Sequence, residues 1–187
     1  MAQKEKSMKN IVKLIISILI CELAGVAGSI FTAPAIKTWY ALLVKPSFNP
    51  PNWVFAPIWT TLFLLMGIAL YLVWSKNWHI EVKAGQAEQK TWNPLSRKLF
   101  TGSWREENAI AIFVLQLALN ILWSVIFFGL KEPGFAFFEI LMLWFAILYT
   151  IANFWRISKP AGLLLLPYIL WVTLAAVLNF SLWQLNG

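Results

Sequence analysis

The chain has 187 residues, of which 60% are hydrophobic and only 12% charged, and its formal net charge is +7. A soluble domain carries about 25% charged residues, so this composition excludes water as the main solvent of the chain. A membrane β-barrel is excluded as well, because the sequence lacks segments of alternating hydrophobicity about ten residues long.

Five long apolar stretches contain almost none of the charged residues. Each is close to the ~20 residues that a helix needs to cross the hydrocarbon of a bilayer. We therefore predict an all-α integral membrane protein in which residues 1–187 form a single domain. Because three of the four connections contain proline turns or are short, we expect one bundle of antiparallel neighbours. The five predicted transmembrane helices cover residues 11–33, 53–75, 108–129, 134–155 and 161–184.

The first predicted helix follows a run of lysines and contains small residues near its end, as a signal peptide does. Glu22 interrupts the apolar run, and the run continues well beyond it, so we expect a retained helix. Glu22, Gly25, Ser29 and Thr32 form a small, polar stripe along this helix. Glu22 is either an ionisable functional group or a buried acid that neighbouring polar side chains satisfy.

The two longer connections differ in character. Residues 34–52 are rich in proline and aromatic side chains, so we predict an ordered cap on the outer face of the bundle. Residues 76–107 are polar, and we predict a solvated inner loop, either without structure or with a short interfacial helix.

The distribution of basic residues predicts the orientation. Twelve of the fifteen Lys and Arg lie on the side of the N-terminus, and positive loops tend to remain in the cytoplasm. The N-terminus is therefore expected inside. This topology signal accounts for most of the net charge, so we expect no nucleic-acid partner.

Polar and aromatic residues recur at helical spacing in three further helices. Such stripes allow two interpretations. They could line a cavity of indole rings and amides that suits a flat aromatic ligand, or they could join the helices to one another. The stripes are Trp59, Phe63 and Gly67 in the second helix, Gln116, Asn120, Trp123 and Phe127 in the third, and Pro167, Trp171, Ala175 and Asn179 in the fifth.

The twelve tryptophans fall into two groups by depth. Those near helix ends are typical of an interfacial aromatic belt. Trp59, Trp123, Trp144 and Trp171 lie deeper and are candidates for function, with Trp144 the weakest because no polar partner shares its face. The sequence has no metal-binding or conventional catalytic motif, so we expect neither a metal nor a cofactor.

Several motifs in order resemble the translocator protein family, which includes the tryptophan-rich sensory proteins of prokaryotes and the peripheral-type benzodiazepine receptor. The resemblance covers nearly the whole chain. It is carried by Trp39-Tyr40, by Lys45-Pro46-Ser47-Phe48-Asn49-Pro50-Pro51-Asn52-Trp53 with Ala56-Pro57-Ile58-Trp59-Thr60, by Gln116-Leu117-Ala118-Leu119-Asn120 with Trp123, and by Pro167-Tyr168 with Trp171, Ala175 and Leu178-Asn179.

The resemblance implies a five-helix bundle, often a homodimer in lipid, whose pocket binds porphyrins such as protoporphyrin IX beneath the first connection. We therefore expect a multi-pass receptor for tetrapyrroles, in a prokaryotic cell membrane. The alternatives are a light-dependent porphyrin-degrading enzyme, with Trp59 and Trp171 as candidate catalytic residues, and a transporter or channel. The implied ligand-binding residues are Tyr40, Trp59, Phe63, Asn120, Trp123, Trp171 and Ala175, and the stripe in the fifth helix adds Asn179.

Overall fold

The computed structural model describes residues 2–88 and 103–187, with side chains at 7–76 and 108–187. Five helices in these ranges are long and apolar enough to cross a membrane, which confirms an all-α membrane fold with five spans. The inside location of the N-terminus stays a prediction. The spans are Ser7–Lys37, Asn52–Lys76, Asn108–Gly129, Pro133–Ile157 and Lys159–Asn186.

The first three long helices extend beyond their predicted limits. Helix α1 covers Ala2–Lys37, α3 covers Asn52–Glu88 and α5 covers Ser103–Ser124. The predicted inner loop at 76–107 was therefore too long at both ends, and its remainder, residues 89–102, lies outside the described residues. The physical reason is that Ala, Lys, Glu and Gln favour a helix without being apolar, so a helix need not end where hydropathy falls.

The later helices contain two irregular turns that the apolar pattern did not predict. Helix α5 continues into a π-helical turn, η1 (Val125–Gly129), and α6 follows at Pro133–Ile157. The fifth span is divided into α7 (Lys159–Leu164) and α8 (Leu166–Asn186). Pro167 lies in the first turn of α8, and its lack of a backbone N–H prevents one continuous helix from 161 to 184.

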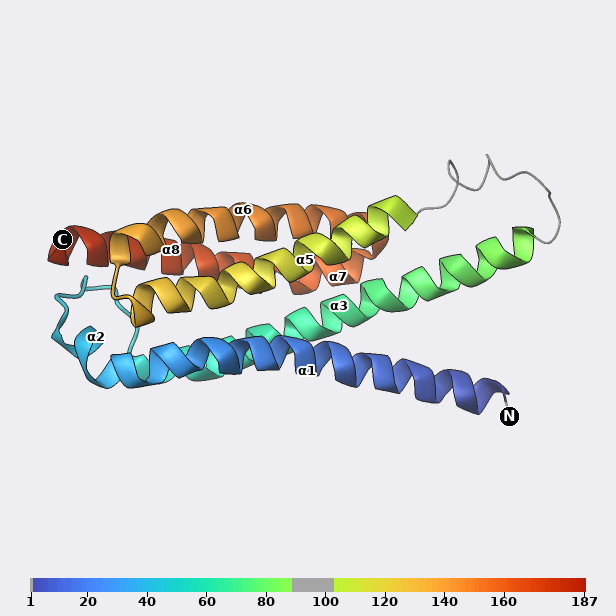
Figure 1. The fold of residues 1–187 in the computed structure, drawn as a ribbon, viewed down its shortest axis with the longest axis horizontal. Helices are drawn as coiled ribbons and strands as arrows, with labels where there is room; N and C mark the ends of the chain where they lie inside the picture. The colour runs from blue at the N-terminus through green and yellow to red at the C-terminus, as the bar shows by residue number, and fades with distance from the viewer. Residues whose placement is uncertain (1, 89–102) are drawn as a thin grey trace.

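The helices form a closed ring around a common core. Helix α1 packs against α3 and α5, α5 packs against α6, and α6 packs against both α7 and α8. The ring closes where α3 meets the fifth span, and it does so mainly through α7. Figure 1 shows the N-terminus at one end of the bundle, and the C-terminus at the other end beside the short helix α2 (Trp39–Leu42).

The half of the bundle away from α2 is filled by buried side chains. The rings of Phe113 in α5 and Phe154 in α6 stack with centroids 5.4 Å apart and planes within 11°. Met66 and Val73 of α3 are fully buried in the same cluster. Close packing of this kind leaves no space for a ligand at that level.

The connection between α1 and α3 packs onto the α2 end of the bundle, in agreement with the predicted cap. The hydroxyl group of Tyr40, a buried residue of α2, donates to Asn49 Oδ1 at 3.0 Å. The side chain of Asn186, at the end of α8, accepts from Val44 N at 2.8 Å and donates to Val44 O at 2.9 Å. These bonds attach the connection to the C-terminal end of the chain.

Helices α1 and α3 approach most closely at Gly67. A Cβ atom added there would lie 2.6 Å from Ile18 Cα, so the two backbones would have to separate. We expect Gly67→Ala to lower the free energy of unfolding by about 1–3 kcal/mol, measured by denaturant titration in detergent. Gly28→Ala is the control, because its Cβ would meet only the Ser124 hydroxyl at 3.0 Å. Equal stability of the two variants would contradict this account.

Candidate functional site

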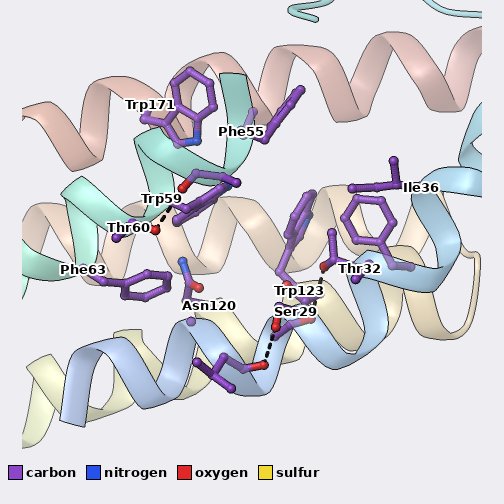
Figure 2. A pocket seen from close by; sticks show the side chains of 18 of the residues that line it. Ser29, Thr32, Ile36, Phe55, Trp59, Thr60, Phe63, Asn120, Trp123 and Trp171 are labelled. Carbon is purple, nitrogen blue, oxygen red and sulfur yellow. Dashed lines mark hydrogen bonds between the residues drawn. The ribbon is translucent and has the colours of Figure 1, made fainter. Parts of the chain in front are cut away.

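A cavity of about 390 Å³ lies in the half of the bundle nearest α2. Side chains from α1, α2, α3, α5, η1 and α8 line it. Its volume is within the range of small-molecule sites, which is about 300–1,000 Å³. Figure 2 shows indole and phenyl rings on several sides of this space, with α1 and α3 at its border.

Four aromatic side chains from α3 and α8 form one part of the wall. Trp59 and Phe63, one turn apart on α3, stack with ring centroids 5.6 Å apart. Phe55, one turn before Trp59, meets Trp171 of α8 edge to face at 5.7 Å. These rings present faces and edges on which a flat apolar ligand can stack.

The side of the cavity formed by α5 is held by two hydrogen bonds to α8. Asn120 Nδ2 donates to the Tyr168 hydroxyl at 3.0 Å, and Trp123 Nε1 donates to Asn179 Oδ1 at 3.0 Å. Asn179 in turn donates through Nδ2 to Pro133 O at 2.7 Å. The orientation of the Trp123 ring therefore depends on a residue behind it.

Tyr40 closes the cavity from the side of the connection. Its ring lies under the Lys45 ammonium, with Nζ 4.8 Å from the ring centroid, a cation–π distance. Burial raises the pKa of Tyr40 above its ordinary value of about 10. The hydroxyl therefore stays protonated and continues to donate to Asn49 at neutral pH.

The polar stripe of α1 forms another side of the cavity. Glu22, Gly25, Ser29 and Thr32 all line it. The lack of a side chain at Gly25 makes room for a cavity ring, because a Cβ there would lie 2.6 Å from the Phe63 ring.

Seven of the eight residues predicted to bind ligand border this one cavity, and the eighth lies behind it. Asn179 is 1% exposed and supports Trp123 without lining the space. Contact of any of these residues with a ligand stays a prediction. The seven are Tyr40, Trp59, Phe63, Asn120, Trp123, Trp171 and Ala175.

Two members of the predicted α5 stripe do not reach the cavity. Gln116 is fully buried below it, and Phe127 packs against Tyr40 and Trp39 in a separate small cluster. Phe128 lines the cavity instead of Phe127. The π-helical turn at Val125–Gly129 explains the change, because its wider turn alters which residue faces inward.

Other lining residues were missed although the sequence contained a signal for some of them. Phe55 precedes Trp59 by one turn, so the spacing rule that selected Trp59 and Phe63 would also have selected it. Thr60, which is exposed, precedes Phe63 by three residues and Gly67 by seven, so helical spacing would also have selected it.

Trp144 lies outside this cavity. It has a polar partner on the adjacent helix, because its Nε1 donates to Thr173 Oγ1 of α8 at 2.9 Å. Both residues border a shallow groove on the outer surface between α6 and α8. The spacing of one helix alone could not identify a partner on another.

The match of this chain to known proteins extends over almost its whole length. The model of the TspO/MBR family matches residues 17–184. The chain is 41% identical to the tryptophan-rich protein TspO of Archaeoglobus fulgidus over 178 residues, 95% of this chain and 99% of that one. It is 36% identical to protein CrtK of Rhodobacter capsulatus, covering 89% and 88% of the two chains. It is also 36% identical to the translocator protein of Homo sapiens, covering 85% and 81%.

Proposed function

The chain belongs to the TspO/MBR family, and on that premise we propose that it is a membrane receptor that binds porphyrin-type aromatic ligands in the cavity near α2. Its role would be the sensing or handling of tetrapyrroles. The observation that carries the proposal is the convergence of Trp59, Phe63, Trp123 and Trp171 on one cavity inside a membrane bundle. Large flat rings stack favourably on such a wall.

The packing of the other half of the bundle favours a receptor over a channel. The cavity lies near α2, whereas Phe113, Phe154, Met66 and Val73 fill the core beyond it. A solute entering from the α2 end would meet closely packed side chains instead of a path through the bundle.

A receptor also accounts for the positions of the two tryptophans that were candidate catalytic residues. Trp59 and Trp171 both border the cavity. Side chains that only stack on a bound ring, and do not react with it, need the same position. Among the residues that the structure describes, no further feature favours breakdown of the ligand over its binding.

Titration of the protein in lipid nanodiscs with protoporphyrin IX tests the proposal. We expect saturable quenching of tryptophan fluorescence, and about tenfold weaker binding in Trp171→Ala, because one stacking surface is lost. Trp155→Ala serves as the matched control, since Trp155 lies on α6 and does not line the cavity. Quenching that does not saturate, or an equal effect of both substitutions, would contradict the proposed receptor.

A further inference from the structure

Glu22 is the one carboxylate among the described residues that line the cavity. It lies at the middle of the span Ser7–Lys37, the depth at which an ionisable group is most costly in a bilayer. Among the described residues, its carboxyl group has no hydrogen-bond or ion-pair partner. An unpaired carboxyl group at this depth is therefore available to a ligand that supplies the missing donor.

Three hydroxyl groups that line the cavity already use their hydrogens within their own helices. Ser29 Oγ donates to Val26 O at 2.7 Å, Thr32 Oγ1 donates to Gly28 O at 3.1 Å, and Thr60 Oγ1 donates to Ala56 O at 3.0 Å. A hydroxyl has one hydrogen and two lone pairs. Towards a ligand, these three groups can only accept.

The cavity wall also carries donors, including those of Asn52, Trp59 and Ser124. Trp123 Nε1 is bonded to Asn179, and the Tyr40 hydroxyl is bonded to Asn49. Trp171 Nε1 is the buried donor in the wall that has no partner among the described residues. Asn120 keeps both functions, because only one of its amide hydrogens is used, in the bond to Tyr168.

Some of the acceptors lie at the edge of the cavity. Ser29 and Thr60 line the cavity and are also exposed, and so is Val26, which is 57% exposed. Residues with both properties mark the place where the cavity opens outward, between α1 and α3. Glu22 lies one turn before Val26 and two turns before Ser29, on the same face of α1. Figure 2 shows Ser29 across the cavity from Trp171.

From this inventory we propose that the cavity selects aromatic ligands that carry N–H donors, and that Glu22 is the residue that determines this selectivity. The inference rests on the proposed function, since it requires that the cavity binds a ligand. The N–H groups of the ligand face the α1–α3 opening and donate to Glu22, while Trp171 donates to an acceptor on the opposite side of the ligand. A ligand without N–H groups leaves the carboxyl group unpaired at mid-membrane depth.

A matched pair of flat probes tests the selectivity. Carbazole carries one ring N–H, and N-methylcarbazole replaces that hydrogen with a methyl group. Binding of each to the protein in nanodiscs is measured by quenching of tryptophan fluorescence, with empty nanodiscs subtracted. In the unmodified protein we expect carbazole to bind about tenfold more tightly, as one hydrogen bond allows.

Three variants assign the preference to its residue. Glu22→Leu should reduce the ratio of the two affinities to within about twofold, whereas Glu22→Gln, which keeps an acceptor oxygen, should retain most of it. Glu139→Gln makes the same chemical change at a buried carboxyl group of α6 that does not line the cavity, and the ratio should not change. The Glu22 variants should fold, because both replace an ionisable group in the hydrocarbon with one that does not ionise.

The outcomes separate the two proposals. If the unmodified protein binds protoporphyrin IX but does not prefer carbazole, or if Glu22→Leu keeps the preference, the selectivity role of Glu22 is wrong and the receptor stands. If the protein prefers carbazole but does not bind protoporphyrin IX, the role of Glu22 stands and the porphyrin assignment fails. If it binds none of the three compounds, both proposals fail.

Discussion

Ala175→Phe is expected to weaken the binding of protoporphyrin IX by about thirtyfold or more. Ala175 lines the cavity from α8, on the same face as Trp171 one turn earlier. A phenyl ring at this position would project into the 390 Å³ space that the ligand needs. Because the ring enters an existing cavity, the free energy of unfolding should change by less than about 1 kcal/mol.

The adjacent residue provides the control for this experiment. Ala176 lines the outer groove between α6 and α8, so Ala176→Phe adds the same ring to the same helix but on its outer surface. Its affinity should stay within about twofold of the unmodified protein, a difference of under 0.5 kcal/mol. If both variants bind protoporphyrin IX equally well, the ligand does not occupy the cavity near α2.

Much of the site could be predicted because straight helices place residues at regular angles. The intervals from Trp59 to Phe63 and from Trp171 to Ala175 are single turns of uninterrupted helix, and all four residues face the cavity. The five spans were predictable for a related reason. A segment that crosses hydrocarbon must satisfy its backbone internally and cover itself with apolar side chains, and both requirements are visible in sequence.

The errors occur where this regularity is lost or where a second helix decides the outcome. The π-helical turn replaced Phe127 with Phe128 at the cavity, and neither residue type marks such a turn. The role of Asn179 depends on Trp123 and Pro133, which are distant in sequence. The burial of Glu139 was not predicted, because this residue is a single carboxyl group within an apolar helix and belongs to no polar stripe.

The polar and aromatic stripes could either line a cavity or join helices, and both interpretations hold at different positions of one helix. On α8, Ala175 borders open space, whereas Asn179 one turn later is a structural link. Sequence spacing could place both residues on one face. It could not predict that the Trp123 ring would lie between Asn179 and the cavity.

Asn179→Leu should be among the most destabilising substitutions at the site. It removes the bonds from Trp123 Nε1 at 3.0 Å and to Pro133 O at 2.7 Å, which together connect α8 to α5 and to the first turn of α6. A leucine of similar size leaves both half-buried partners without this bond. Allowing for the modest value of hydrogen bonds between membrane helices, we expect a loss of about 2–4 kcal/mol in the free energy of unfolding, measured by denaturant titration.

Thr173→Val is the appropriate comparison, because it removes one indole hydrogen bond from the same helix, the 2.9 Å bond from Trp144, on the outer surface. Its cost should be below about 1 kcal/mol, the typical value for such a bond. Binding distinguishes the two variants further. Only Asn179→Leu releases the Trp123 ring that borders the cavity, so only that variant should weaken protoporphyrin IX binding. Equal stability and equal affinity of the two variants would mean that Asn179 neither holds the helices together nor orients the cavity wall.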